Sequence, residues 1–339
     1  MEYTVAVVGI GMVGGEMLKV LNERNFPAKR IKVLATRARK EVIYGREYEV
    51  VPASIEEFEG VDFAFFAGTE GARGASQQYG WAAAEKGCIV IDNGDDFRMD
   101  DRVPLVVPEV NSEHLNRHKG FIANPNCSTI QMVTALAPLH RKARIRRVVV
   151  NTYQAVSGTG RAAVVELEEQ VKAFAAGEGL EHEVYPHQIA FNVIPQVSSL
   201  KDSFPGYYGE EIKMIREPRK MFDDPEMRIS ATCVRVPVVK GHSEAINVQF
   251  EDKMTASEAR EILEAAPGVK VVDDPANSVY PMALFAAETD PVYVGRIRQD
   301  TSAENCIDFW CVADNIRKGA ALNAVQIAEK MIEMGLVRK

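Results

Sequence analysis

Cys127 is the residue of this chain best suited to covalent chemistry, and it lies in the stretch Asn-Pro-Asn-Cys-Ser-Thr at 124–129. Apolar residues follow it at intervals of three and four, which predicts a helix that begins near the cysteine, and Ser128 with Gln131 resembles a capping box. A thiol at a helix N-terminus faces unpaired backbone N–H groups and the positive end of the helix dipole, and both favour the thiolate. We therefore interpret Cys127 as a candidate nucleophile, the alternative being a small buried hydrophobic residue.

A thiol mechanism near neutral pH also needs a group that can give and take a proton, and histidine is the natural choice. Most of the six histidines lie in polar helical or loop segments, whereas His242 stands between two strand-like segments, in Val-Lys-Gly-His-Ser-Glu at 239–244. Rigid strands can hold a side chain at the edge of a cleft. His242 is therefore the candidate acid and base, and an ordinary hydrogen-bonded turn histidine is the equally simple alternative.

A second kind of site is indicated near the N-terminus, where Gly9, Gly11 and Gly14 form a G-x-G-x-x-G pattern with Met12 and Val13 between the last two glycines. The pattern follows a short apolar strand and opens a helix. In that context the glycines permit the tight turn, the approach of a pyrophosphate and the packing of helix on strand. We predict a dinucleotide-binding loop made of these residues, the alternative being an ordinary glycine-rich turn.

The end of the next strand indicates which dinucleotide would bind. An NAD enzyme normally carries an acidic residue there for the ribose 2′-hydroxyl. This chain has the cationic run Thr-Arg-Ala-Arg-Lys at 36–40, in which Thr36 and Arg37, with either Arg39 or Lys40, are suited to a 2′-phosphate. The prediction is NADP, and a solvated basic turn is the alternative.

Composition limits the remaining classes of function. A length of 339 residues predicts two domains, and a net charge of −8 with dispersed cations argues against nucleic-acid binding and leaves small molecules as partners. Five scattered cysteines without a C-x-x-C pair predict neither disulfides nor a metal site, and they favour a cytoplasmic location. No targeting segment and no membrane span are expected.

Hydrophobic patterning predicts a different architecture for each part of the chain. Short strands alternate with helices in the first third, which is typical of a Rossmann-type, doubly wound parallel sheet. Longer alternating segments from residue 146 onward indicate an α+β domain with a largely antiparallel sheet. The strands are expected at 4–9, 31–35, 62–67, 88–92, 148–156, 229–239, 245–251, 292–299 and 306–312, and the helices from Met12 and at 75–86, 161–176, 210–222 and 315–333. We place the first domain at 1–126, completed by the C-terminal helix 314–339, and a catalytic and dimerisation domain at 127–313.

Several ordered motifs resemble the aspartate-semialdehyde dehydrogenase family, and together they cover nearly the whole chain. They are the cysteine motif at 124–129, Tyr-Gln-Ala-Val-Ser-Gly at 153–158, Ala-Phe-Asn-Val-Ile-Pro-Gln at 190–196, Glu-Glu-Ile-Lys-Met at 210–214, Cys-Val-Arg-Val-Pro at 233–237, and the segment 314–323. The resemblance implies that NADPH reduces 4-phospho-L-aspartate to aspartate 4-semialdehyde and phosphate, on the pathway to lysine, threonine and methionine.

The resemblance also implies catalytic roles. Cys127 would attack the acyl carbon and form a thioester, His242 would act as acid and base, and Gln154 would orient the reacting groups. Asn126 would bind near the reacting centre. Cofactor binding would extend to Gly158 and Asn315.

The family's substrate-binding positions correspond to four charged residues of this chain. Arg98 and Lys213 can hold a phosphate, Arg235 can form a bidentate pair with the α-carboxylate, and Glu210 can pair with the α-ammonium group. Glu210 and Lys213 are one helical turn apart and should share a face. The alternative for each residue is a surface charge or a salt bridge.

The sequence departs from the family pattern at three places. The cofactor loop is commonly Gly-Ala-Thr-Gly-Ala-Val-Gly and is shorter here. Asp95 and Asp96 add two carboxylates beside Arg98, and Glu70 puts an acid in a turn near the cofactor that is usually rich in serine and glycine.

Two other functions stay open from the sequence. N-acetylglutamyl-phosphate reductase shares the thioester logic, but its substrate has no free amine for an acid such as Glu210. A non-catalytic relative would keep the fold without the chemistry. The strands of the second domain are suited to pairing in a homodimer, as in the family, and a tetramer is left open.

Overall fold

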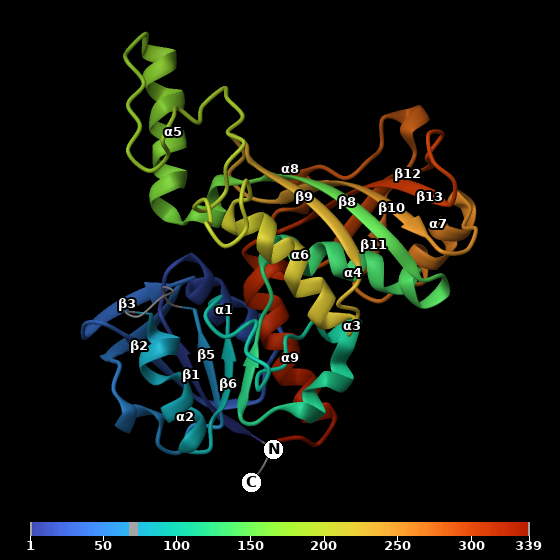
Figure 1. Cartoon of the computed structure of the whole chain (residues 1–339). Coiled ribbons are helices and arrows are strands. Elements are labelled where there is room, and N and C mark those ends of the chain that lie inside the picture. The colour runs from blue at the N-terminus through green and yellow to red at the C-terminus, as the bar shows by residue number, and fades with distance from the viewer. Residues whose placement is uncertain (1, 68–73, 338–339) are drawn as a thin grey trace. The chain divides into compact units, whose positions relative to one another are not determined.

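The computed structural model describes residues 2–67 and 74–337. The chain divides into two compact units, residues 1–126 with 320–339, and residues 127–319 (Figure 1).

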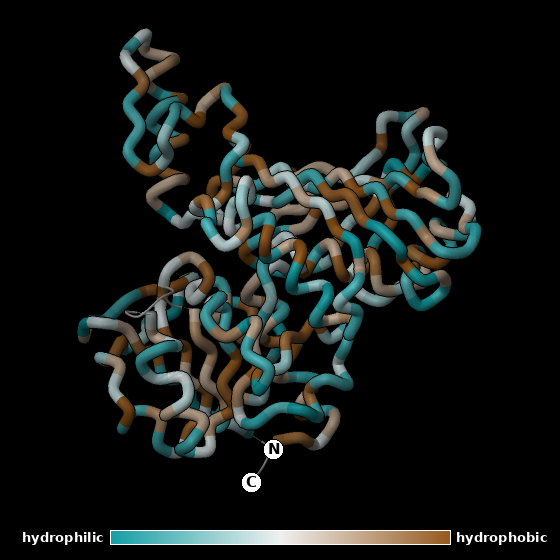
Figure 2. Tube along the Cα trace, in the orientation of Figure 1, coloured by the Kyte–Doolittle hydropathy of each residue, from teal (hydrophilic) through white to brown (hydrophobic). Residues whose placement is uncertain are grey.

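The first unit is a seven-stranded sheet in the order β3-β4-β2-β1-β5-β6-β7. All of its neighbouring strands are parallel except β3 and β4. The inner strands β1, β5 and β6 are buried along their whole length and are the hydrophobic centre of the unit in Figure 2. The strands are β1 (Tyr3–Val8), β2 (Ala28–Ala35), β3 (Arg39–Ile43), β4 (Arg46–Pro52), β5 (Phe63–Phe66), β6 (Ile89–Asp92) and β7 (Phe121–Ala123).

Helices complete the core of this unit. The last helix, α9 (Leu322–Glu333), buries Leu322, Val325, Ala328 and Met331 in the same cluster as strand β1, at the spacing expected of one helix face. A π-helical turn, η6 (Arg317–Ala321), precedes it. The other helices are α1 (Met12–Glu23), η1 (Ile55–Phe58), η2 (Ser76–Gly80), α2 (Trp81–Glu85), α3 (Pro108–Asn111) and η3 (Ser112–Arg117).

The β3–β4 hairpin was not predicted. Its two-residue turn, Tyr44-Gly45, has positive φ at both positions, 47° and 76°, and Ile43 pairs with Arg46 across it. These angles are those of a type I′ turn, which matches the twist of an antiparallel pair. The basic run at 36–40, predicted as a cofactor-binding turn, continues into this hairpin, because Arg39 and Lys40 are the first residues of β3.

The second unit is a six-stranded sheet in the order β11-β12-β13-β10-β8-β9. Strand β10 is antiparallel to β8 and β13, and β12 is antiparallel to β13, whereas β8–β9 and β11–β12 are parallel. The predicted fold class, with a largely antiparallel second sheet, is confirmed. The strands are β8 (Ile145–Gln154), β9 (Arg228–Arg235), β10 (His242–Phe250), β11 (Val269–Val271), β12 (Val292–Gln299) and β13 (Cys306–Ala313).

Helices α4, α6 and α7 pack on one face of this sheet over a core that includes Leu136, Val150, Met214, Val248 and Leu263. Helix α5 and the loop that follows it project away from the sheet (Figure 1). The helices are α4 (Cys127–Lys142), η4 (Val156–Thr159), α5 (Arg161–Ala176), α6 (Gly209–Met221), α7 (Ala256–Glu264), η5 (Pro275–Asn277) and α8 (Ala283–Ala286).

Helix α4 begins where the sequence predicts, but the predicted capping box of Ser128 and Gln131 does not form. The helix begins at Cys127, so Ser128 lies inside its first turn. The side chains of Ser128 and Gln131 are fully buried, and the Gln131 amide has no hydrogen-bond partner among the described residues. A capping box needs that side chain to reach back to the backbone, so the predicted box does not form.

Candidate active site

The sheet of the second unit places three predicted site residues at one edge. Gln154, the last residue of β8, pairs with Arg235, the last residue of β9. His242 begins β10, one step beyond the pair Ser243–Tyr153 that joins β10 to β8. Side chains alternate along strands, and all three of these residues are buried, on the face that carries the helices.

Gln154 connects this edge to helix α6. Its Nε2 donates a hydrogen bond to Glu210 Oε1 at 2.9 Å, and its Oε1 accepts one from Thr152 Oγ1 at 3.0 Å. Lys213 Nζ lies 3.7 Å from the second carboxylate oxygen of Glu210. The prediction that Glu210 and Lys213 share a helix face is confirmed. The arrangement joins a carboxylate, an amide and an ammonium group.

Glu211, which the sequence reasoning missed, anchors α6 at this position. Its carboxylate accepts hydrogen bonds from the backbone N–H of Tyr208, at 2.9 Å, and of Cys233 in β9, at 3.1 Å. The first bond caps the helix and the second ties the cap to the sheet. An acid three residues after the cap position is a sequence signal for the first bond, but the bond to β9 joins residues far apart in the chain.

Arg235 is 5% exposed, and its Nη1 donates to the carbonyl oxygen of Ala155 at 2.6 Å. Its Nε is buried and meets no acceptor within the described part of the chain. A Cβ on Gly158 would lie 3.0 Å from Nη1 of Arg235 and 3.2 Å from Nε2 of His242. Gly158 is predicted to bind the cofactor. Because it has no side chain, space stays open next to the side chains of both Arg235 and His242.

Among the described residues, one hydrogen bond holds the ring of His242. Its Nδ1 accepts from the backbone N–H of Ala155 at 3.0 Å, and no described residue offers a partner to its buried Nε2. Burial, followed by the positive charge of Arg235, lowers the pKa of His242 to about 3, and Glu210 acts in the opposite direction.

Asn315 joins the two loops that carry these residues. Its Oδ1 accepts from the backbone N–H of Gly241 at 2.9 Å, and its Nδ2 donates to Ser157 Oγ at 3.0 Å. Gly241 has φ of 92°, and a Cβ there would lie 2.9 Å from the carbonyl oxygen of Ala283. The structure thus gives Asn315 a positioning role, and its predicted contact with the cofactor stays a prediction.

Cys127 is half-buried, whereas the other four cysteines are buried free thiols. Burial raises the pKa of each of these four, to about 11 for Cys88. Gly319 packs against the nucleophile candidate, because a Cβ on it would lie 2.9 Å from Cβ of Cys127. Gly319 was not predicted as a site residue, although it falls within the family motif at 314–323.

The glycine loop of the first unit has the shape that a dinucleotide needs. Gly9 has φ of 90°, and a Cβ on Gly14 would lie 1.9 Å from the Gly9 carbonyl oxygen. A Cβ on Gly11 would meet no atom within 4 Å, so space lies beside the N-terminus of α1. Met12 and Val13 are half-buried in the first turn of this helix. These residues fit a bound pyrophosphate.

The basic run at 36–40 is divided between an exposed turn and strand β3. Thr36 and Arg37 lie in an exposed turn. Arg39 and Lys40 belong to β3 and form ion pairs with Glu41 at 2.7 Å and Glu47 at 2.9 Å. Of the predicted phosphate ligands, Thr36 and Arg37 therefore stay the better candidates.

Arg98 and Asn126 belong to the first unit and are buried. Arg98 donates from Nε to the carbonyl oxygen of Asn124 at 3.0 Å, and from Nη2 to that of Asn93 at 2.7 Å. These bonds fix the guanidinium in place. Whether either residue binds substrate stays a prediction.

Of the three acids that depart from the family pattern, the structure describes Asp95 and Asp96. Nearby Asp92 is buried, and burial raises its pKa to about 6; hydrogen bonds from Gly94 and Ser76 and the charge of Arg98 oppose this rise, and the charge of Asp96 adds to it. Glu70 lies outside the described residues. The part of the chain that the structure describes contains no group of three or more side chains suited to a metal ion. Nor does it contain a helix long and apolar enough to cross a membrane.

Comparisons with known proteins agree over the whole length. Residues 4–118 match the family described as "Semialdehyde dehydrogenase, NAD binding domain", and residues 136–318 match "Semialdehyde dehydrogenase, dimerisation domain". The aspartate-semialdehyde dehydrogenase of Aquifex aeolicus is 49% identical, over 99% of this chain and all of that protein. The enzyme of Bacillus subtilis is 45% identical over 98% of each.

Solved structures show the same relationship. Aspartate-semialdehyde dehydrogenase II of Vibrio cholerae, solved in complex with ASA, is 40% identical with a TM-score of 0.92, over 98% of this chain and 99% of that one. The Candida albicans enzyme with NADP is 22% identical with a TM-score of 0.73 and shares the fold. The resemblance found from the motifs is thereby confirmed, and the chain belongs to the aspartate-semialdehyde dehydrogenase family.

Proposed function

We propose that this chain catalyses the NADPH-dependent reductive dephosphorylation of 4-phospho-L-aspartate to aspartate 4-semialdehyde and phosphate. The observation that carries the proposal is the cluster of Gln154, Glu210, Arg235 and His242 at one sheet edge, in the unit where α4 begins with the half-buried Cys127. Such a set matches a substrate with an amine, a carboxylate and an activated acyl group.

Cys127 would displace phosphate from the acyl carbon and hold the acyl group as a thioester. The helix N-terminus favours its thiolate. Gln154 would orient the reacting groups, and Asn126 would bind near them. His242 would act as acid and base.

The charged residues would bind the ends of the substrate. Glu210 would receive the α-ammonium group, and the unsatisfied Nε of Arg235 suits the α-carboxylate. Lys213 and Arg98 would hold the phosphate. The free amine is one feature that distinguishes this substrate from the N-acetylated glutamyl phosphate of the related reductase.

NADP would be held by Gly9, Gly11, Met12, Val13 and Gly14 on the pyrophosphate side. Thr36 and Arg37 would take the 2′-phosphate, and Gly158 and Asn315 would border the nicotinamide end. When bound, NADPH supplies the hydride that reduces the thioester carbon. We assign NADP binding to residues 1–126 with 314–339, and catalysis with dimerisation to 127–313.

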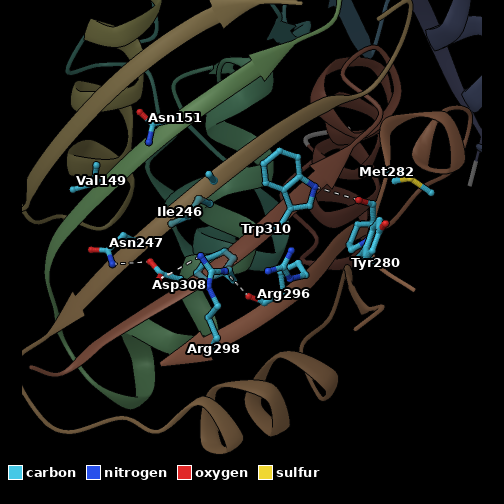
Figure 3. A pocket seen from close by; sticks show the side chains of 13 residues that line it. Val149, Asn151, Ile246, Asn247, Tyr280, Met282, Arg296, Arg298, Asp308 and Trp310 are labelled. Carbon is cyan, nitrogen blue, oxygen red and sulfur yellow. Dashed lines mark hydrogen bonds and ion pairs between the residues drawn. The ribbon is translucent and has the colours of Figure 1, made fainter. Parts of the chain in front are cut away.

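We propose a homodimer formed through the face of the second sheet that the helices leave uncovered. Figure 3 shows a pocket on this face lined by Trp310, Tyr280, Met282, Arg296 and others. Trp310 Nε1 donates to the Pro281 carbonyl oxygen at 3.2 Å, which holds the ring in this face. The solution mass from light scattering tests the dimer, and a mass four times that of the chain would indicate the tetramer instead. Free thiols at all five cysteines support a cytoplasmic location.

The test of the reaction is a coupled assay run in the reverse direction with aspartate semialdehyde, phosphate and NADP. We expect NADPH formation that depends on phosphate. N-acetylglutamate semialdehyde is the matched control substrate and should give none. Activity with the N-acetylated substrate alone, or with neither substrate, would contradict the proposal.

A further inference from the structure

The loop that follows helix α5 returns to the sheet at Arg235. The backbone N–H of Ile194 donates to the carbonyl oxygen of Arg235 at 3.0 Å, and the N–H of Arg235 donates to that of Ile194 at 2.8 Å. The side chain of Arg235 is held separately, by its bond to the carbonyl oxygen of Ala155. The segment 178–194 therefore lies against the residue proposed above to bind the α-carboxylate of the substrate.

Tyr185 connects this segment to the turn that follows Ala155. Its hydroxyl group lies 2.9 Å from Oγ1 of Thr159, and the two groups form a hydrogen bond. Thr159 ends η4, which begins directly after Ala155. The ring of Tyr185 is buried in one hydrophobic cluster with Ile194. The backbone groups on either side of Arg235, at Ala155 and at Ile194, are thereby linked to this one side chain.

Two polar side chains of α5, both buried and one helical turn apart, hold the segment that carries Tyr185. Glu166 Oε2 accepts from the backbone N–H groups of residues 183–184, both at 2.6 Å. Gln170 Oε1 accepts from those of residues 189–190, at 3.1 and 2.8 Å. Tyr185 lies between the two pairs of bonds. A segment that is neither helix nor strand is therefore fixed on both sides of the tyrosine.

We propose that Tyr185 is a positioning residue for Arg235 and thereby helps to set the affinity for the α-carboxylate of the substrate. A bidentate pair requires the guanidinium plane to match the carboxylate plane, so a small rotation of the guanidinium weakens binding. Nε of Arg235 is buried and meets no acceptor within the described residues, which leaves it for that carboxylate. The proposal rests on the function proposed above and adds a residue that acts on the substrate through another.

The electrostatics of the phenol agree with this placement. Burial raises the pKa of Tyr185, and the positive charge of Arg235 is the largest effect that opposes the rise, ahead of the hydrogen bond with Thr159. Glu166 adds weakly to the rise. The oxygen end of the phenol therefore lies within reach of the guanidinium charge.

Tyr185→Phe separates the hydroxyl group from the packing of the ring. We expect KM for aspartate semialdehyde to rise about threefold to tenfold in the reverse assay, the effect of one lost hydrogen bond, with kcat and KM for NADP unchanged. Tyr79→Phe is the matched control, since its ring packs on Phe58 in the first unit and its hydroxyl group has no hydrogen bond among the described residues. An unchanged KM, or a loss confined to kcat, would overturn the proposal.

A double-mutant cycle with Arg235→Lys shows whether Tyr185 acts through Arg235. Lysine keeps the positive charge but cannot form the bidentate pair. In the Arg235→Lys background we expect Tyr185→Phe to change KM by less than about twofold, because the geometry that it supports is already lost. A merely structural role would give effects that multiply, and that result would overturn the proposal.

Thr159 tests the same hydrogen bond from its other end and decides the question if Tyr185→Phe does not fold. Thr159→Val removes the hydroxyl group and should raise KM for aspartate semialdehyde as Tyr185→Phe does. Thr159→Ser keeps the hydroxyl group, so its KM should lie about threefold to tenfold below that of Thr159→Val. Equal KM values for the two variants would overturn the proposal.

The failure of this proposal and that of the proposed function give different results. If the wild-type chain shows no activity with aspartate semialdehyde and phosphate, the proposed function is wrong and the role of Tyr185 fails with it. If the wild-type chain is active while Tyr185→Phe and Thr159→Val keep its KM, the function stands and the positioning role alone is wrong.

Discussion

Backbone forms the Gly9–Gly14 loop of the first unit, whereas buried side chains form the edge around Gln154 in the second. At Gly14 an added Cβ would lie 1.9 Å from the carbonyl oxygen of Gly9. The shape of the loop therefore depends on the absence of a side chain at this position. At Gln154 each polar atom of the side chain has a hydrogen-bond partner, Glu210 from α6 and Thr152 from β8 itself. A site made of backbone can accept any dinucleotide pyrophosphate. A site made of buried charges is selective, because a substrate that leaves one of them unpaired is penalised.

Removal of the nucleophile should have the largest effect. We expect Cys127→Ala to lower kcat by about 10⁴-fold or more, because the covalent route is lost and only binding and electrostatic assistance remain. The measurement is steady-state turnover in the reverse assay. Cys306→Ala, at a buried cysteine in β13, is the control and should keep its activity. Normal turnover of Cys127→Ala would refute the thioester scheme.

A pair of glycine substitutions tests the backbone site. Gly14→Ala must displace the Gly9 carbonyl, and overpacking of this kind costs about 1–3 kcal/mol, so the midpoint of thermal unfolding should fall. Gly11 has an extended backbone and open space around the position of a Cβ, so Gly11→Ala should leave the unfolding midpoint unchanged. The same methyl group would occupy the space proposed for the pyrophosphate, so we expect weaker NADP binding by calorimetry. Unchanged affinity in Gly11→Ala would show that the cofactor does not approach the loop there.

A substitution in the exposed turn after β2 should have a smaller effect, limited to the binding of one of the two cofactors. Arg37→Ala should raise KM for NADPH about tenfold, equivalent to about 1.4 kcal/mol, and leave KM for NADH unchanged, since only NADPH has a 2′-phosphate. Lys40→Ala is the control, because Lys40 pairs with Glu47 at 2.9 Å. An equal change for both cofactors in Arg37→Ala would argue against phosphate recognition.

The sequence allowed both sites to be located but not their internal contacts to be predicted. The glycine pattern is local, and its strand and helix flanks predict the turn directly. The contact between Gln154 and Glu210 joins residues 56 positions apart, and the bond from Ala155 to His242 spans 87, so no local pattern could reveal either. The family resemblance named the residues without their geometry.

Two of the elements that the sequence did not predict correctly have different causes. The turn at Tyr44-Gly45 lacks the Asn-Gly or Asp-Gly signal of a type I′ hairpin, so two strands passed unnoticed. Ser128 and Gln131 have the spacing of a capping box, but burial against the sheet directs them elsewhere. Tertiary packing overrode the local preference in the second case.

Glu244 is a buried acid of the second unit for which the proposed reaction has no role. It lies two residues after His242 on β10, is fully buried, and neither carboxylate oxygen has a hydrogen-bond partner within the described residues. Burial raises its pKa well above the ordinary value. The amide of Gln131 is the neighbour that opposes this effect, although no hydrogen bond of acceptable geometry joins the two.

The raised pKa of Glu244 predicts how stability depends on pH. The folded chain keeps the proton while the unfolded chain loses it above about pH 4.3, so the contribution of Glu244 to stability is complete below that pH. As the pH rises toward the folded pKa, the free energy of unfolding should fall by about 1.4 kcal/mol per pH unit. Glu244→Gln has no such proton to lose, and it should unfold at a higher temperature than the wild-type chain near pH 8, with little difference near pH 4. Thermal unfolding between these pH values is the measurement, with the exposed Glu169→Gln as control. A lower unfolding temperature for Glu244→Gln at pH 8 would mean that the carboxylate is ionised and held by a partner in the folded chain.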